Sequence, residues 1–280
     1  MLPEYLFLFM IFSFSCFLLL TFAEAKLPQE EVDVLQEITS TLGATYWKLD
    51  GDSCEIQTVG VTLEPPRNSE SSIGCDCHFE NNTVCHVLPK VTIQFAMYYR
   101  VLKGYSLPGM LPPQLVKLHY LREISVLVNR LSGGIPKELG NITTLTYLSL
   151  EANQFSGTLP PELGNLVNLQ TLILSSNNLT GSLPTTFARL RNLTDFRIND
   201  NNFGGQLPEF VQYWKLLTRL RISDINGSYQ DFPVLRNISG IVRLVLRNCK
   251  ISGEIPAYIW TMKNLEMFLE KSTIYADKGA

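Results

Sequence analysis

The stretch LTYLSLEANQFSGTLPPELGNLVN, residues 145–168, is one copy of a 24-residue unit that repeats without insertion. Six full copies fill residues 121–264, and a seventh copy begins but does not finish. The unit reads L-x-x-L-x-L-x-x-N-x-L-x-G-x-I/L-P-x-x-L-x-x-L. A fixed period of this length predicts units that each stack on their neighbours. The copies open at Leu121, Leu145, Leu169, Leu193, Leu217, Ile241 and Leu265.

Each unit begins with apolar residues at alternate positions, which predicts one short strand with these residues facing a core. A single strand cannot bury that face alone, so neighbouring units must stack. The pattern is that of the leucine-rich repeat. We therefore predict an α/β solenoid of plant-type 24-residue units, with a parallel sheet on its concave face. The expected core pairs are Leu148 and Leu150, Leu172 and Leu174, and Phe196 and Ile198.

Three polar or special residues mark the turn after each strand. The ninth position is asparagine, whose amide can satisfy buried backbone groups where the strand ends. Glycine at the thirteenth position allows an unusual backbone angle, and proline at the sixteenth stiffens the chain. These residues are Asn129, Asn153, Asn177 and Asn201; Gly133, Gly157, Gly181, Gly205 and Gly253; and Pro136, Pro160, Pro184, Pro208 and Pro256.

One unit, residues 217–240, departs from the pattern. Ile225 replaces the asparagine, Gly227 a leucine and Tyr229 the glycine, while the proline moves to Pro233. We expect this unit to keep its strand but to have a remodelled convex turn. In the next unit Cys249 takes the ninth position, where cysteine is an accepted alternative, and we expect a buried free thiol.

The beginning of the chain predicts secretion. Residues 5–20 are almost wholly apolar, and Ala23 and Ala25 are the small residues that a signal peptidase reads, so we predict a signal peptide over residues 1–25. Glu4 and the lack of Lys or Arg in this region leave an uncleaved signal anchor as an alternative. The whole chain has a net charge of −3, which gives no basic excess for nucleic acid, and no cofactor is predicted.

Residues 26–90 are predicted to form a cysteine-rich N-terminal cap, with a helix over residues 29–42. In an oxidising compartment its four cysteines predict two disulfides, for which three connectivities are open. A zinc site is the alternative, because two histidines accompany these cysteines, but the usual C-x-x-C spacing is missing. The candidates for disulfides are Cys54, Cys75, Cys77 and Cys85.

The two ends of the repeat array are irregular. Residues 91–120 are predicted to form a first, irregular repeat, in which residues 91–95 and 100–102 compete to be the strand, so that FAMYYRV reads as an insertion. Residues 265–280 form a partial repeat and an aberrant tail, because Glu270 stands where a core leucine belongs. We expect an uncovered hydrophobic end and a frayed or truncated C-terminus.

Six N-x-S/T sequons predict a glycosylated extracellular surface, and none of them falls on a strand position that would face the concave groove. The acceptors are Asn81, Asn141, Asn178, Asn192, Asn226 and Asn237.

The G-x-I/L-P units of residues 133–184 resemble the extracellular repeats of plant receptor-like kinases. CDCHFENNTVCHV, LKGYSLPGMLPP, LRISDINGSYQDFP and LVLRNCKISGEIPAYIW are more narrowly similar to the subfamily with a malectin-like domain. The resemblance covers about residues 32–268. It implies a receptor ectodomain, here truncated before the malectin-like, transmembrane and serine/threonine kinase regions. It also implies a peptide, protein or cell-wall-derived ligand, a co-receptor kinase, and a place in the apoplast or on the outer face of the plasma membrane.

Catalytic motifs are missing from the sequence. There is no Gly-rich phosphate loop, no V-A-I-K, no H-R-D-L-x-x-x-N and no D-F-G, so kinase activity is not carried over. The histidines His78, His86 and His119 accompany no placed nucleophile, and we expect His119 on the surface. Besides a receptor ectodomain or its soluble form, two alternatives stay open: a secreted inhibitor of a cell-wall hydrolase, similar to polygalacturonase inhibitors, and a nonfunctional fragment.

Candidate ligand-binding residues lie beside the core leucines, on the side of the strands that faces the groove. The C-terminal half of this surface is basic. Arg219 and Arg221 could form a fork for a peptide carboxylate, since guanidinium binds carboxylate through two hydrogen bonds. Ion pairing with Asp195, Asp200 and Asp224 is the alternative role of these arginines. The predicted set is Arg197, Arg219, Arg221, Arg243, Arg247 and Tyr147.

Overall fold

The computed structural model describes residues 27–44, 47–49, 56–58, 71–79, 84–93 and 107–271, with side chains for residues 27–44 and 107–266. The predicted signal peptide, Cys54, Asn81 and the FAMYYRV insertion lie outside the described residues. So do the side chains of Cys75, Cys77 and Cys85, and the disulfides therefore stay a prediction.

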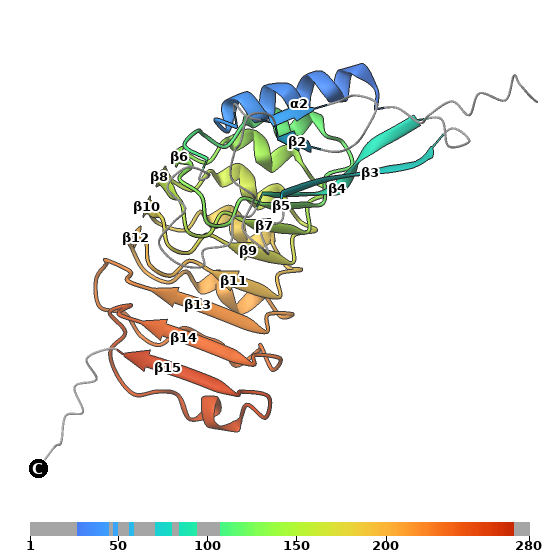
Figure 1. Cartoon of the computed structure of the whole chain (residues 1–280). Helices are drawn as coiled ribbons and strands as arrows, with labels where there is room; N and C mark the ends of the chain where they lie inside the picture. The colour runs from blue at the N-terminus through green and yellow to red at the C-terminus, as the bar shows by residue number, and fades with distance from the viewer. Residues whose placement is uncertain are drawn as a thin grey trace, which may run out of the picture.

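A nine-stranded sheet covers one side of the stacked units (Figure 1). Its last seven strands come one from each unit, parallel and in chain order. The register joins equivalent positions: Leu148 pairs with Leu172, and Leu172 pairs with Phe196. The predicted solenoid with a parallel sheet is confirmed. These strands are β5 (Glu123–Ser125), β7 (Tyr147–Ser149), β9 (Thr171–Ile173), β11 (Asp195–Arg197), β13 (Arg219–Ser223), β14 (Arg243–Arg247) and β15 (Met267–Lys271).

Apolar side chains from every described unit form one continuous core. The six predicted core residues at the strands are all fully buried. Trp214 is the largest fully buried side chain; its ring lies 4.8 Å from that of Phe196, and its indole N–H donates to the carbonyl of Phe187 at 3.1 Å. A buried indole is stable here because its one donor has a partner.

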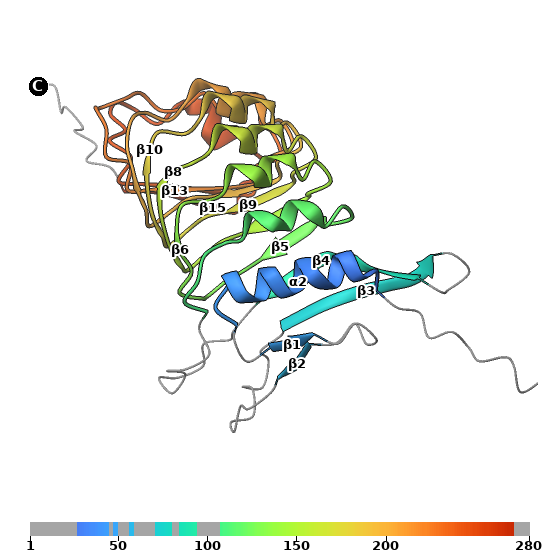
Figure 2. The same ribbon diagram turned by 90° about the horizontal axis from the view of Figure 1, so that it is seen from above.

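Short strands and 3-10 helices lie on the other sides of the core, and the units of β5, β7, β9 and β11 have one of each (Figure 2). The thirteenth-position glycines all have positive φ, for example +75° at Gly181, as the sequence predicts. The sixteenth-position prolines come directly before the 3-10 helices. The flanking sheet holds β6 (Ser132–Gly133), β8 (Gln154–Thr158), β10 (Asn178–Gly181) and β12 (Asn202–Phe203). The helices are η1 (Pro113–Lys117), η2 (Lys137–Asn141), η3 (Pro161–Asn165), η4 (Thr185–Arg189), η5 (Glu209–Tyr213) and η6 (Ala257–Thr261).

The ninth-position asparagines connect neighbouring units. The amide of Asn177 donates to the carbonyl of Leu150 in the preceding unit and to two carbonyls in its own unit, at 2.9–3.2 Å. Its oxygen accepts from the N–H of Phe155, also in the preceding unit, at 3.0 Å. Asn153 and Asn201 make the same set of bonds. Each of these asparagines therefore satisfies buried backbone groups of two units at once. We call this series of hydrogen bonds the asparagine ladder.

The irregular unit keeps strand β13 and has no 3-10 helix between η5 and η6, as predicted. Its ladder position holds Ile225, a buried side chain without an amide. The amide of Gln230 lies in the same unit: it accepts from the N–H of Leu207 at 2.7 Å and donates to the carbonyl of Cys249 at 2.8 Å. In the following unit the buried thiol of Cys249, which is in no disulfide, lies 3.6 Å from the carbonyl of Ile222 and 3.4 Å from that of Arg247.

A tyrosine hydroxyl takes over the bonds of the missing helix. In regular units the N–H of the nineteenth residue donates to the carbonyl of the sixteenth-position proline, as from Leu163 to Pro160. In the irregular unit the N–H of Leu235 donates instead to the hydroxyl of Tyr258, and that hydroxyl donates to the carbonyl of Pro233, each at 3.0 Å. Tyr258 belongs to the next unit, so it joins two units across the irregular turn.

The N-terminal cap places a helix on the first unit. Helix α2 (Gln29–Thr41) buries Val32, Leu35 and Ile38 as predicted, and the N–H of Gly109 donates to the carbonyl of Leu42 just beyond its end. A short hairpin of β1 (Trp47–Leu49) and β2 (Ile56–Thr58) follows. Strand β3 (Ser71–Phe79) then pairs with β4 (Val84–Ile93) in antiparallel fashion. Val91 of β4 pairs with Ile124, so residues 91–93 belong to the strand of the first repeat.

At the C-terminal end the seventh unit does form its strand. Glu270 of β15 pairs with Leu246, so an acidic residue holds the position of a core leucine, as predicted. Trp260 in η6 has an exposed fraction of 68%. The chain beyond residue 271 lies outside the described residues, and the predicted fraying there stays a prediction.

We expect Asn177→Ala to lower the free energy of unfolding by about 3 kcal/mol, because several buried backbone groups lose their partner. Urea denaturation of the two proteins measures this difference. Asn168→Ala is the matched control, since the exposed Asn168 donates one bond, to the carbonyl of Thr143. A loss no larger than that of the control would contradict the role of the ladder.

We expect Tyr258→Phe to lower the free energy of unfolding by about 1–2 kcal/mol, because the N–H of Leu235 and the carbonyl of Pro233 both lose the hydroxyl. Tyr213→Phe is the control, as Tyr213 is half exposed on η5 and its hydroxyl has no hydrogen bond within the described residues. Equal thermal stability of Tyr258→Phe and the wild type would show that the hydrogen bonds of the hydroxyl do not replace those of the missing 3-10 turn.

Candidate ligand-binding face

The outward-pointing positions of strands β5 to β14, here called the sheet face, form two straight columns. The strand register joins the first column from Glu123 through Tyr147, Thr171, Asp195 and Arg219 to Arg243, and the second from Ser125 through Ser149, Ile173, Arg197 and Arg221 to Val245. They hold the positions beside the core leucines that the sequence predicts for the groove, and they are straight because the period of 24 residues never slips. The acidic Glu123 lies at the N-terminal end and the arginines at the C-terminal end.

Asp195 organises the first group of arginines. Its side chain has an exposed fraction of only 7%, and both its oxygens accept from Arg197, at 2.8 Å to Nε and 2.6 Å to Nη2. Arg219 reaches the same carboxylate at 3.4 Å. The hydrogen bond with Asp195 raises the pKa of Arg197 above its ordinary value, against the opposing effect of burial. A buried carboxylate needs such partners, so both arginines are committed to it.

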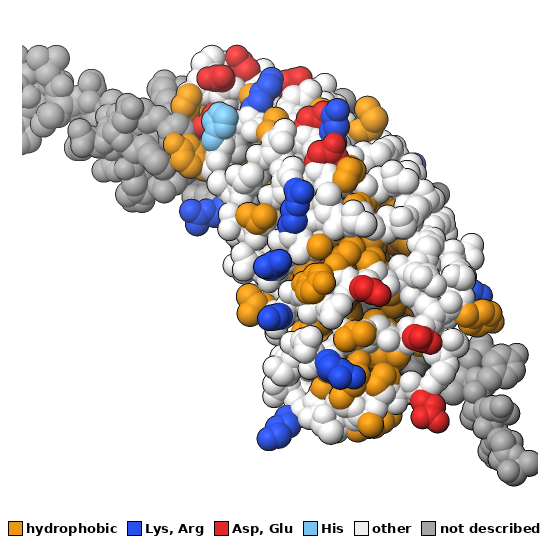
Figure 3. Space-filling view, turned by 180° about the vertical axis from the view of Figure 1, so that it is seen from behind, with side chains coloured by type: hydrophobic (Ala, Val, Ile, Leu, Met, Phe, Trp, Pro, Cys, Tyr) orange, Lys and Arg blue, Asp and Glu red, His pale blue; other side chains and the backbone are white. Residues whose placement is uncertain are grey.

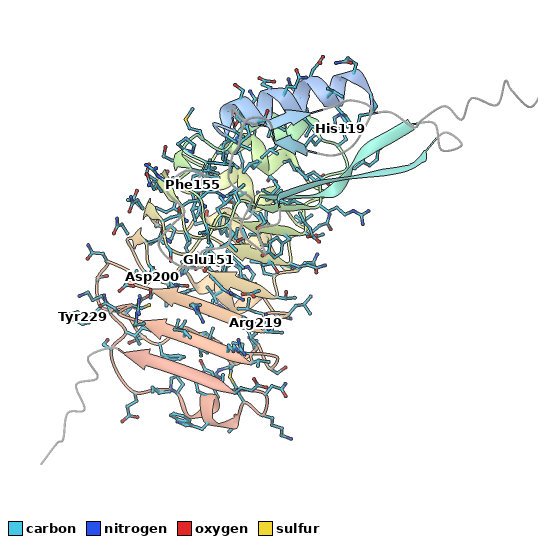
Figure 4. The ribbon with its side chains drawn as sticks, viewed as in Figure 1. His119, Glu151, Phe155, Asp200, Arg219 and Tyr229 are labelled. Carbon is cyan, nitrogen blue, oxygen red and sulfur yellow. The ribbon has the colours of Figure 1, made fainter. Side chains whose placement is uncertain are left out.

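A second group lies at the C-terminal ends of the strands, where Figure 4 labels Asp200. Nη2 of Arg247 contacts Asp200 at 2.7 Å and Asp224 at 3.1 Å. Asp224 also accepts from Ser223 at 2.5 Å and from Asn248 at 3.0 Å. Ion pairing therefore explains Arg247 as well as Arg197 and Arg219. These three arginines are thus ion-paired with aspartates, which is the alternative role considered in the sequence analysis.

Arg221 and Arg243 differ from the other arginines. Neither makes an ion pair or a side-chain hydrogen bond within the described residues. Arg221 is half-buried and Arg243 is exposed. With Arg197, Arg219, Leu220 and Val245 they line a small hollow of about 40 Å³ in the sheet face. Two guanidinium groups that have no ion-pair partner in the described part of the chain thus share one hollow.

Other predicted residues lie away from this hollow. Tyr147 is half-buried on β7 and is separated from Arg219 by strands β9 and β11. His119 is exposed after η1, as predicted (Figure 4). Within the part of the chain that the structure describes, no three His, Cys, Asp or Glu residues lie close enough together to hold a metal ion. The sequons in this part are all exposed, at Asn141, Asn178, Asn192, Asn226 and Asn237, while glycosylation itself stays a prediction.

Two features of the site were not predicted from the sequence. Asp200 and Asp224 both have positive φ, at 56° and 60°, a conformation that aspartate tolerates better than most residues. Ser223 is fully buried, and its hydroxyl accepts from the N–H of Asp200 at 3.0 Å. The recurrence of a short polar residue at the eighth position of these units is the signal that could have indicated the strained turn.

The pH dependence of stability follows from Asp224. Burial alone would raise its pKa, but hydrogen bonds from Ser223, Asn248 and Arg247, with the charge of Arg247, hold it below the usual 3.8. A pKa lowered by folding stabilises the folded state above the unfolded pKa, and this contribution is lost as pH falls through the folded pKa. We expect Asp224→Asn to be less stable than the wild type at pH 7 and to approach it below about pH 3.

Urea denaturation of both proteins across this range measures the effect, and NMR titration of the Asp224 carboxyl in Arg247→Gln should show its pKa rising. A stability difference that is the same at every pH would contradict this account.

Comparisons with known proteins relate the repeat domain of this chain to those of plant receptor-like kinases. Over 127 residues it is 45% identical to a probable LRR receptor-like serine/threonine-protein kinase of Arabidopsis thaliana, RFK1; the alignment covers 45% of this chain and 11% of the relative. The chain thus spans about a tenth of the length of such relatives. Its repeat domain is homologous to those of Arabidopsis LRR receptor-like kinases. No described helix is long and apolar enough to cross a membrane.

Solved structures agree on the fold. The plant peptide hormone receptor RGFR1 in complex with RGF2 is 30% identical, with a TM-score of 0.56 over 59% of this chain and 26% of that one. The LRR ectodomain of GASSHO1/SCHENGEN3 from Arabidopsis thaliana, 24% identical, has a TM-score of 0.58 over 84% of this chain and 29% of that one. A family model described as a leucine-rich repeat region matches residues 101–251, which is more than half of the chain. The chain therefore belongs to the leucine-rich repeat family.

Proposed function

We propose that this chain is the ligand-recognition ectodomain of a plant receptor-like kinase, or a soluble form of it, and that its sheet face binds a peptide or protein at the cell surface. The observation that carries the proposal is the pair Arg221 and Arg243, two arginines that line one hollow of the sheet face and make no ion pair with any described residue. Their neighbours Arg197 and Arg219 are already bound to Asp195.

The geometry favours an anionic group as the part of the ligand that binds here. Asp195 holds Arg197 and Arg219 in fixed positions, so the hollow has rigid walls. Four arginines line the hollow, and the one buried carboxylate nearby, that of Asp195, is bound to two of them, which leaves an excess of positive charge. A carboxylate placed at Arg221 and Arg243 would accept several charge-assisted hydrogen bonds and relieve this repulsion. The fork proposed from sequence for Arg219 and Arg221 is therefore moved to Arg221 and Arg243.

The size of the hollow limits what enters it. A volume of about 40 Å³ holds a carboxylate or a comparable small group, whereas the rest of the ligand would lie along the open columns of the sheet face. The C-terminal carboxylate of a peptide fits this description. Further along the columns, Tyr147 and Thr171 offer a half-buried aromatic ring and a hydroxyl. The likeness to a peptide hormone receptor supports a peptide as ligand.

Finer parts of the proposal rest on sequence motifs. The segments at residues 75–87, 102–113, 220–233 and 244–260 favour the subfamily with a malectin-like domain. A co-receptor kinase as a further partner and a place in the apoplast follow from the same resemblance.

The test captures secreted plant peptides on the immobilised wild-type protein and identifies them by mass spectrometry. The synthetic peptide is then measured by calorimetry with a free and with an amidated C-terminus. We expect Arg221→Gln to weaken binding of the free acid about tenfold or more, because charge-assisted bonds are lost. Amidation of the peptide should weaken binding to the wild type by a similar factor. Arg221→Gln should bind the amidated peptide only slightly more weakly than the wild type does.

Two variants serve as controls. Arg219→Gln should weaken binding less than Arg221→Gln, since Arg219 is engaged by Asp195. Arg191→Gln, an exposed arginine on the other side of the unit, should leave affinity unchanged. Equal affinity of Arg221→Gln and the wild type for every captured peptide would exclude the hollow as the binding site.

A further inference from the structure

A second pocket lies on the opposite side of the solenoid from the sheet face, between the irregular unit and helix η6. Its volume is about 360 Å³, which is within the range of sites for small ligands. The irregular unit, which contributes Arg236 and Ser239 to the pocket, lacks the 3-10 helix of its neighbours. The residues that matter here are Arg236, Ser239, Tyr258, Thr261, Lys263 and Asn264.

Tyr258 fixes the position of Arg236. The tyrosine hydroxyl is held from two sides, by the N–H of Leu235 and the carbonyl of Pro233. The guanidinium carbon of Arg236 lies 5.6 Å from the centre of this immobilised ring. The contact with the ring uses the face of the guanidinium and leaves its N–H groups, which lie in the plane, for a ligand.

The pocket carries an excess of positive charge. Arg236 and Lys263 both line it, neither has an ion-pair partner within the described residues, and no acidic residue is among those that line it. At the position of Arg236 the preceding units carry Gly140, Gly164, Ala188 and Gln212, so this charge is particular to the irregular unit. An anionic ligand would satisfy both groups.

Hydroxyl and amide groups surround the two cations. The hydroxyl of Ser239 has no hydrogen bond within the described residues. Thr261 donates its hydroxyl proton to the carbonyl of Tyr258 at 2.7 Å and keeps its lone pairs for a donor. Asn264 donates to the carbonyl of Ser239 at 3.4 Å, which leaves its amide oxygen to accept. These groups match a ligand that carries hydroxyls as well as a negative charge.

The surroundings of the pocket agree with an exposed recognition surface. Figure 3 shows this side of the molecule, with apolar side chains gathered over its C-terminal half and basic and acidic side chains near them. Among the large apolar side chains of this region, Tyr213, Leu216, Val234 and Trp260 have exposed fractions of 46–68%. Sugar rings pack their C–H groups on such surfaces while their hydroxyls bind polar side chains.

We propose that this pocket binds a carboxylated sugar, with the carboxylate at Arg236 and Lys263 and the ring hydroxyls at Ser239, Thr261 and Asn264. An acidic peptide is the rival ligand. It would satisfy the two cations but has no ring of hydroxyls for the remaining groups. The proposal does not depend on the function of the sheet face, because no residue is shared between the two sites.

The test measures binding of glucuronate and galacturonate to the full chain by calorimetry and by saturation-transfer NMR. Glucose and galactose test the need for the carboxylate, acetate tests the need for the hydroxyls, and a blocked Asp-Gly-Asp peptide tests the rival ligand. All proteins carry Asn237→Gln, so that no glycan at the sequon beside Arg236 covers the pocket. We expect at least one uronate to bind about tenfold or more tighter than glucose, galactose, acetate and the peptide.

The variants test the residues. Arg236→Gln should weaken uronate binding about tenfold, and Arg236→Lys should lie between this variant and the wild type, because it keeps the charge but loses the planar donors. Lys263→Gln should also weaken binding. Lys215→Gln is its matched control, since Lys215 holds the same repeat position two units earlier, and Arg191→Gln is the control for Arg236. Both controls should bind as the wild type does.

Circular dichroism and thermal denaturation establish that each variant is folded before binding is compared. The proposal is overturned if neither uronate binds, or if acetate or the peptide binds as tightly as the uronates. It is also overturned if Arg236→Gln binds a uronate with wild-type affinity. None of these results bears on peptide binding at Arg221, which the sheet-face variants Arg221→Gln and Arg219→Gln test separately.

Discussion

The hydrogen bonds of the ninth-position asparagines are the constraint on which this solenoid depends. At every unit the chain leaves the strand inside the core, where carbonyl and N–H groups have no water to bind. One amide satisfies carbonyls of two units and an N–H of the earlier one, as Asn177 does. Because these bonds join equivalent positions, the units stack without slipping, and the columns of the sheet face inherit their straightness from the buried ladder.

On the sheet face, aspartates form ion pairs with some of the arginines and not with others. Asp195 is buried and takes Arg197 and Arg219 as partners, while Asp200 and Asp224 take Arg247. What is left, Arg221 and Arg243, makes no ion pair within the described residues. The paired arginines are part of the framework: their charge raises the local potential, while some of their N–H groups are already bound to aspartates.

Regular parts of this structure could be predicted from sequence because a period of 24 residues fixes both the strand and its register. The core pairs, the glycines with positive φ and the two columns all follow from position in the repeat. The partner of each arginine does not, since side-chain direction depends on which carboxylate is buried. Nothing in the sequence indicates that Tyr258 reaches back to Leu235. The positive φ of Val128, at 56°, is equally unexpected, because stacking imposes it against the preference of a β-branched residue.

The asparagine ladder is directional, because each amide closes the turn of the unit before it. Ile225 offers no amide to the unit of Asn201, and Gln230 binds only Leu207 of that unit, so the series of asparagine bonds is interrupted at this junction. In a linear array, cooperativity passes only between adjacent members. The array should therefore behave as two blocks of unequal length, and local opening observed by hydrogen exchange should begin at the seam between them.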